Sequence, residues 1–170
     1  DNAEFNENWD VLPEYTLKAF KYLTEHFGEY PYPQYTVIQG GDGGMEYPMA
    51  TLITGRRNLR SLVGVTIHEA SHSWFHGVIA TNERLYEWMD EGCTSFATSE
   101  VMAELCVDPT RIPHASAYQS YLGLARDGKD EALITHADHY NTNRAYGTTA
   151  YSKGEVLLTQ LEYVIGKENR

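Results

Sequence analysis

The segment His68-Glu69-Ala70-Ser71-His72 places two imidazoles and a carboxylate at a spacing that suits metal chemistry. On an α-helix, positions i and i+4 lie about 40° apart around the axis. His68 and His72 would therefore present their rings from one face, as a tetrahedral Zn²⁺ bound through nitrogen requires. Glu69 would project beside the ion, where a carboxylate can take a proton from bound water whose pKa the metal lowers to roughly 7. Taken alone, the segment is equally compatible with two buried histidines that are merely hydrogen-bonded.

A carboxylate at a fixed distance favours the metal interpretation. A catalytic zinc site needs a third protein ligand and one open position. Glu91 follows His72 after 18 residues. It lies in a second helical pattern over Tyr86–Glu104, and the connection before this pattern is long enough for the second helix to fold back on the first. We therefore predict one Zn²⁺ ion, held by His68, His72 and Glu91.

A glycine-rich segment precedes the first of these two helices. Residues 41–48 read Gly-Asp-Gly-Gly-Met-Glu-Tyr-Pro. Glycine permits positive φ angles and close approach of the backbone. The segment is therefore predicted to form a hairpin turn between a strand over Tyr35–Gln39 and a strand over Met49–Thr54.

These patterns together resemble the M1 family of zinc aminopeptidases, within the gluzincin group. The family pattern is His-Glu-x-x-His, eighteen residues and then Glu, and it is matched by His68, Glu69, His72 and Glu91. The Trp-Phe that follows the second histidine in the family is also present, as Trp74-Phe75. The resemblance spans roughly Phe27 to Leu161.

The resemblance implies a substrate-binding role for the glycine-rich segment. In the family this segment reads Gly-x-Met-Glu-Asn and is an edge strand, to which a substrate peptide adds as a further strand. It implies that the substrate edge consists of Gly43, Gly44, Met45 and Glu46. Glu46 would bind the free α-amino group through charge-assisted hydrogen bonds. The family asparagine is replaced here by Tyr47, which alters the first subsite.

The resemblance also selects one tyrosine. The chain has 13 tyrosines, so spacing alone does not separate Tyr151 from Tyr146. The family carries a Tyr-x-Lys-Gly motif whose hydroxyl donates to the developing oxyanion, and this motif matches residues 151–154. A family glutamate seven residues after the third ligand is replaced by Thr98. A hydroxyl or a backbone carbonyl is a candidate to hold the metal-binding histidines instead, and the sequence leaves this partner unassigned.

The elements that position these residues follow from hydrophobic periodicity. Strands before, and helices after, indicate an α+β fold: a small mixed sheet with a glycine-rich edge followed by a mainly helical part. Helices are predicted over Pro13–Phe27, Leu59–Phe75, Tyr86–Glu104, from Asp108-Pro109 to Asp127-Gly128, and over Tyr151–Ile165. By resemblance this is the thermolysin-like catalytic domain, a single domain over residues 1–170 that is a fragment of a larger M1-type enzyme. The missing flanking domains help to wall the cleft in the family.

The composition and net charge of the chain limit the classes of partner that it could bind. The net charge of −11 argues against a nucleic-acid partner, which needs a basic patch. No apolar run approaches the roughly 18 residues that span a membrane, and no signal peptide is recognisable, which leaves the compartment open. The pair His136 and His139 has no third ligand at a sensible spacing, and we predict a loop or subsite role for it.

The predicted function is that of a zinc metallopeptidase that removes N-terminal residues from peptides. Attack by zinc-activated water with Glu69 as general base is the predicted mechanism. Peptides with a free N-terminus are the predicted substrates. Two alternatives stay open: an endopeptidase or another gluzincin hydrolase, and a non-catalytic domain that binds zinc.

Overall fold

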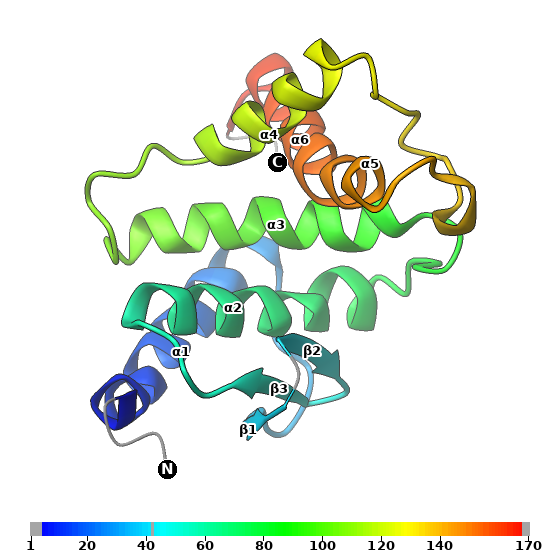
Figure 1. Cartoon of the computed structure of the whole chain (residues 1–170). Helices are drawn as coiled ribbons and strands as arrows, with labels where there is room; N and C mark the ends of the chain where they lie inside the picture. The colour runs from blue at the N-terminus through cyan, green and yellow to red at the C-terminus, as the bar shows by residue number, and fades with distance from the viewer. Residues whose placement is uncertain (1–4, 42, 168–170) are drawn as a thin grey trace.

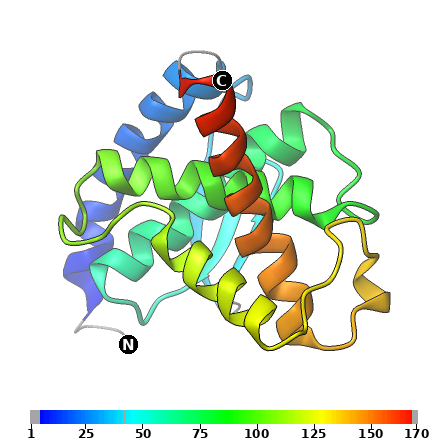
Figure 2. The same ribbon diagram turned by 90° about the horizontal axis from the view of Figure 1, so that it is seen from above.

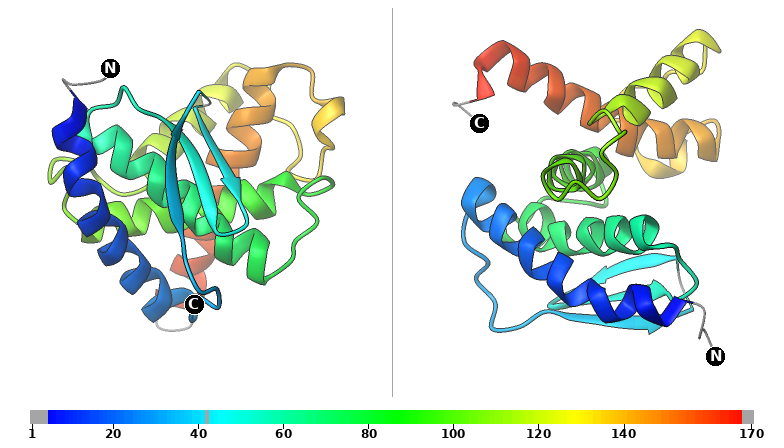
Figure 3. Two further views of the ribbon diagram at one scale, coloured as in Figure 1. Left: turned by 90° about the horizontal axis from the view of Figure 1, so that it is seen from below. Right: turned by 90° about the vertical axis from the view of Figure 1, so that its left-hand side faces the viewer.

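The computed structural model of the chain describes residues 5–41 and 43–167. Figure 1 shows α2 (Leu59–His72) between a small sheet on one side and α3 (Glu87–Glu104) on the other. The remaining C-terminal helices lie beyond α3, and the side view in Figure 3 shows the same layers. The expected α+β fold, a small mixed sheet followed by a mainly helical part, is confirmed.

The sheet differs from the hairpin that the sequence predicts. Its strands are β1 (Thr36–Gly40), β2 (Gly44–Tyr47) and β3 (Ala50–Thr54), in the order β1-β3-β2. β1 runs parallel to β3, and β2 runs antiparallel to it. The two predicted strands therefore do not form a hairpin. The glycine-rich segment instead contributes a strand of its own at the edge, and the turn falls at Met49, which has a φ of 60°.

The first helix begins earlier than predicted. α1 runs over Asn6–Phe27 and contains Pro13, which was expected to start it. The extra turns are anchored from outside the helix, because the indole Nε1 of Trp9 donates to the carbonyl of Gly55 at 3.1 Å. These tertiary contacts offset the backbone hydrogen bond that a proline inside a helix removes.

α2 is well specified by its own sequence. The side chain of Asn58 caps its N-terminus by accepting a hydrogen bond from the Ser61 amide at 2.9 Å. Leu62, Val63 and Ile67 are buried in the core that α2 shares with α1, β3 and α3. Beyond its last residue, the chain continues as a π-helical turn over Ser73–Val78 instead of the predicted α-helix to residue 75.

α3 and α6 (Gly154–Ile165) cross at very short range (Figure 2). A Cβ added to Gly92 would lie 2.8 Å from the Cα of Gly154, so this crossing requires glycine on both helices. α6 is preceded by a π-helical turn over Thr148–Lys153, where the sequence predicted α-helix from Tyr151. Single π-turns are frequent at functional sites. The crossing brings Tyr151 down onto the N-terminal part of α3.

The fourth helix begins later than predicted. α4 runs over Ala115–Arg126 and does not start at Asp108. Pro113 disfavours helix at the residue before it, and His114 has a φ of 61°. Two short elements, η3 (Ala137–His139) and α5 (Asn143–Gly147), lie between α4 and the last helix, where no element was predicted. Within the described residues, no helix is both long and apolar enough to cross a bilayer.

Candidate metal centre and active site

Three predicted metal ligands converge between α2 and α3. Nε2 of His68 lies 3.1 Å from Oε2 of Glu91, and Nε2 of His72 lies 3.5 Å from the same oxygen. Tetrahedral zinc with bonds of about 2.0–2.1 Å requires ligand atoms about 3.3 Å apart. The geometry and the two-imidazole, one-carboxylate donor set therefore both fit a zinc ion.

The electrostatics of this cluster also favour a cation. Burial alone would raise the pKa of Glu91, but hydrogen bonds from His68 and His72 lower it to about 2. Burial lowers the pKa of His72, and hydrogen bonds with Asp90 and Glu91 outweigh it and raise the pKa to about 10. The site thus keeps the carboxylate of Glu91 ionised and favours positive charge beside it.

The ring nitrogen of His72 that faces away from Glu91 contacts a carboxylate, that of Asp90, which the sequence did not predict. This nitrogen, Nδ1, lies 2.6 Å from Oδ1 of Asp90, and the hydroxyl of Thr94 lies 3.3 Å from the same nitrogen. Thr98, which stands where the family has a glutamate, donates to the backbone carbonyl of Thr94. The sequence left this partner unassigned, and the structure shows that the principal partner is the carboxylate next to the third ligand, with the hydroxyl of Thr94 as a second one.

Glu69 is buried beside the metal ligands and close to the edge strand. Burial raises its pKa to about 7, although the charges of His68 and His72 oppose this shift. Its carboxylate approaches Gly44 so closely that a Cβ there would clash with it, and would lie 2.6 Å from Cγ2 of Val65. Glycine at this position therefore lets the edge strand reach the carboxylate.

β2 brings the predicted amine anchor to the same point. The carboxylates of Glu46 and Glu69 and a ring nitrogen of His72 all lie within 4.8 Å of one another. In a strand, alternate side chains point to opposite faces. Met45 and Tyr47 therefore lie on the other face from Glu46, and both are partly exposed.

Tyr151 reaches the metal ligands, whereas Tyr146 does not. The hydroxyl of Tyr151 donates to Oε1 of Glu91 at 2.7 Å, and its ring is stacked on that of His68 with centroids 5.8 Å apart. Burial and then the charge of Glu91 raise the pKa of Tyr151, so its hydroxyl remains a donor. Tyr146 lines a neighbouring cavity.

The chain matches the Peptidase family M1 domain over residues 13–170. The chain belongs to the M1 peptidase family. It is 30% identical over 152 residues to leucine aminopeptidase 2 of Saccharomyces cerevisiae, a match that covers 81% of this chain and 22% of that protein. It is 29% identical over 163 residues to leukotriene A-4 hydrolase of Xenopus laevis, covering 89% of this chain and 27% of that one.

The fold agrees with this membership. An M1 zinc metallopeptidase of Deinococcus radiodurans, solved as a mutant bound to the peptide Tyr-Ser-Ala, superposes with a TM-score of 0.69. That match has 20% identity and covers 90% of this chain and 33% of the other. This M1 chain spans about a quarter of the length of the curated relatives it matches.

An acidic cavity opens beside Glu91 in this M1 domain. It has a volume of about 420 Å³. Its lining carries six carboxylates, those of Glu46, Glu83, Glu87, Asp90, Glu91 and Asp138, together with Arg84, His136 and Tyr146. Burial raises the pKa of Glu83, and Asp90 and Glu46 add to this shift while His76 opposes it. Of the pair His136 and His139, only His136 lines this cavity, and the cavity as a whole favours a cationic group.

Proposed function

We propose that this protein is a zinc aminopeptidase that removes N-terminal residues from peptides. The observation that carries the proposal is the position of Glu46. Its carboxylate lies within 4.8 Å of the carboxylate of the predicted base Glu69 and of a ring nitrogen of His72. A carboxylate at this distance from the reacting centre fits the α-ammonium of a substrate whose first peptide bond is to be cut.

Each side chain of the site has a role in this reaction. His68, His72 and Glu91 hold the zinc, which when bound supplies a Lewis acid that polarises the scissile carbonyl and activates water. Glu69 accepts a proton from the attacking water and passes it to the leaving amine. The hydroxyl of Tyr151 donates to the carbonyl oxygen as it becomes negative.

The edge strand and the acidic cavity place the substrate. A peptide chain adds to the free edge of β2 along Gly43, Gly44 and Met45 as a further strand. Its amine then lies against Glu46, and its first side chain enters the acidic cavity. Flanking domains of the full-length enzyme are expected to complete the walls of this cleft.

A second candidate function is hydrolysis of a non-peptide bond or of an internal peptide bond by the same centre. One similar protein is named leukotriene A-4 hydrolase, which supports the first of these. An endopeptidase would not need Glu46 so close to the centre. A non-catalytic zinc domain fits least, because a structural site uses four protein ligands, and only three converge within the described residues.

Metal analysis combined with a panel of aminoacyl anilides tests the proposal. We expect one zinc per chain in the full-length protein and hydrolysis of anilides with a free amine but not of their N-acetyl counterparts. Glu46→Gln should lower kcat/KM for the free-amine substrates about tenfold or more, because it removes a charged hydrogen-bond partner. Equal rates on free and N-acetylated substrates would overturn the exopeptidase assignment.

A further inference from the structure

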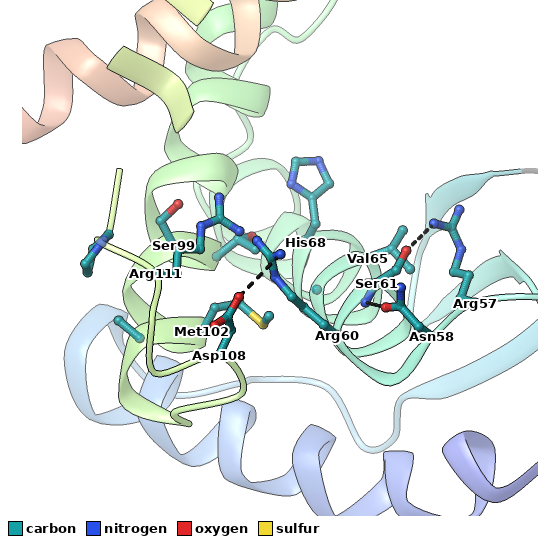
Figure 4. A pocket seen from close by; sticks show the side chains of 14 residues that line it. Arg57, Asn58, Arg60, Ser61, Val65, His68, Ser99, Met102, Asp108 and Arg111 are labelled. Carbon is teal, nitrogen blue, oxygen red and sulfur yellow. Dashed lines mark hydrogen bonds and ion pairs between the residues drawn. The ribbon is translucent and has the colours of Figure 1, made fainter. Parts of the chain in front are cut away.

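A second cavity opens at His68 (Figure 4). Its volume is about 440 Å³, and it shares no lining residue with the acidic cavity. It lies between the N-terminal half of α2 and the C-terminal half of α3. Each cavity is thus bounded by a different metal ligand, Glu91 in the acidic one and His68 here.

The charge of this second cavity is opposite to that of the first. Its lining includes Arg57, Arg60 and Arg111 and a single carboxylate, that of Asp108. The chain as a whole carries a net charge of −11, so three arginines around one cavity are a local reversal of the general charge. The first turn of α2 also lies here and contains no acidic residue, so the positive end of the helix dipole is not neutralised.

The three arginines differ in how far their donors are already used. Arg57 is fixed in place, since its guanidinium donates to the hydroxyls of Thr54 and Ser61 and to the carbonyl of Gly43. It therefore ties the start of the edge strand to α2. The carbonyl of Gly43 is occupied by this contact.

Arg60 and Arg111 keep donors available. Arg60 is half exposed and makes an ion pair with Asp108 at 3.4 Å, and Nη2 of Arg111 donates to the Ser116 hydroxyl at 2.6 Å. A guanidinium offers five N–H donors in a planar fork. Among the described residues, these contacts leave further donors of both guanidinium groups for a ligand, and the exposed ion pair is weak enough to yield to one.

The position of the second cavity relative to the metal ligands determines which part of a substrate it would contact. With the amine on Glu46 and the first side chain in the acidic cavity, the chain beyond the scissile bond must leave on the other side of the metal ligands. That side opens at His68. One or two further residues, at up to about 3.5 Å each, extend a substrate from the centre into this cavity.

We propose that Arg60 and Arg111 form a carboxylate-binding subsite on the leaving-group side of the scissile bond. The preferred substrates are then peptides with an anionic group one or two residues beyond that bond. The anion is the α-carboxylate of a short peptide or the side chain of an acidic residue, since a planar guanidinium recognises both through paired hydrogen bonds. This inference rests on the proposed aminopeptidase function and adds a substrate class to it.

A set of matched substrates tests the subsite in the full-length, zinc-loaded protein. Leu-Ala is compared with Leu-Ala-amide and with Leu-Asp-amide, so that the α-carboxylate and the acidic side chain are read separately. We expect at least one of the two carboxylate substrates to be cleaved with a kcat/KM about tenfold above Leu-Ala-amide. Arg60→Gln and Arg111→Gln should each reduce this preference, and the double variant should abolish it.

Two controls separate this subsite from the proposed function. Leucine anilide carries no anion beyond the scissile bond, so its turnover reports aminopeptidase activity alone and should be unchanged in both arginine variants. Arg126→Gln, at the exposed end of α4 and outside the cavity, should leave every preference intact. Equal kcat/KM for all three dipeptides, or the same loss in Arg126→Gln, would overturn the subsite while leaving the aminopeptidase proposal in place.

Binding gives a readout that does not depend on turnover. In the zinc-loaded Glu69→Gln variant, calorimetry should show Leu-Ala or Leu-Asp-amide binding about tenfold more tightly than Leu-Ala-amide. Adding Arg111→Gln to that variant should remove the difference. If Leu-Ala, Leu-Asp-amide and Leu-Ala-amide bind this variant with equal affinity, the subsite is refuted even if no substrate is turned over.

Discussion

Two clusters of histidine and carboxylate side chains lie along α3, and they differ in which group lies at the centre. At the metal centre, Nε2 of His68 and Nε2 of His72 both face one oxygen of Glu91. Further along the helix, His114 lies between Glu155, 2.8 Å from its Nδ1, and Glu100, 3.1 Å from its Nε2. In the second cluster the imidazole itself occupies the centre.

The difference shows that residue type alone does not make such a cluster suited to a metal ion. Hydrogen bonds with Glu100 and Glu155 outweigh the effect of burial and raise the pKa of His114 to about 9. The charged imidazole of His114 thus fills the centre of its cluster and joins α3, the start of α4 and α6. At the metal centre, three donor atoms instead point at one position that none of them fills, which leaves a place for an ion.

The largest expected effect that separates the two clusters comes from Glu69→Gln. It should lower kcat about 10²–10⁴-fold, because it removes the proposed general base, while zinc content and unfolding midpoint stay close to those of the parent protein. Glu155→Gln is the matched change in the His114 cluster and should lower stability without changing kcat. Anilide turnover, metal analysis and urea unfolding of both variants check this, and most activity surviving in Glu69→Gln would refute the assignment of the base.

Tyr151→Phe tests whether the contact of this tyrosine with the metal ligands has a catalytic consequence. The proposed oxyanion donor is lost while the ring stacked on His68 remains, so kcat should fall about 10²–10³-fold with little change in stability. Tyr146→Phe removes a hydroxyl that lines the acidic cavity and should cost less than tenfold. A similar loss of kcat in both variants would argue that the two hydroxyls act only on the shape of the site.

Asp90→Asn tests whether the contact between Asp90 and His72 supports metal binding. Replacing the carboxylate that lies 2.6 Å from Nδ1 of His72 should weaken zinc binding about 10–100-fold, because an amide orients and polarises the imidazole less strongly. The zinc dissociation constant from competition with a chelator measures the effect directly. Glu104→Gln, at the exposed end of the same helix, is the control, and an equal change in both variants would show that the effect is only one of net charge.

Asp90 also marks the limit of what the sequence could predict at this site. The i, i+4 spacing of the two histidines and the separation of Glu91 are local or near-local patterns, and the structure brings these residues together. Which carboxylate lies behind His72 depends on how α3 is rotated against α2, and a residue next to a ligand is not an obvious candidate. The His114 cluster joins three elements that are distant in sequence, and no local sequence pattern predicts it.

The fold shows the same division. Each predicted helix is present, although the first begins at Asn6 instead of Pro13 and the fourth at Ala115 instead of Asp108, and the mixed sheet with a glycine-rich edge was predicted as well. The parallel direction of the β1 and β3 pairing was missed because the glycine-rich segment between them was interpreted as a turn, whereas part of it forms the strand β2. The N-terminal turns of α1 were missed because contacts such as that of Trp9 with Gly55 override the proline inside the helix.

The smallest expected effect is one of pH and concerns the His114 cluster alone. The pKa of His114 is about 9 in the folded protein and about 6.5 in an unfolded chain, so folding favours the protonated form. Its contribution to stability is therefore fully present below about pH 6.5 and is lost as the pH rises through about 9. His114→Gln should lower the free energy of unfolding by about 1–3 kcal/mol at pH 6.

The stability difference between the parent protein and His114→Gln should shrink steadily between pH 6.5 and 9, while kcat at pH 7 stays unchanged. Urea unfolding of both proteins across this range measures it, with His139→Gln, an exposed histidine, as the control. A stability difference that is constant with pH would mean that His114 is held as a neutral ring. The contrast between a cluster whose centre is filled by a charged imidazole and one that leaves its centre free for a metal ion would then fail.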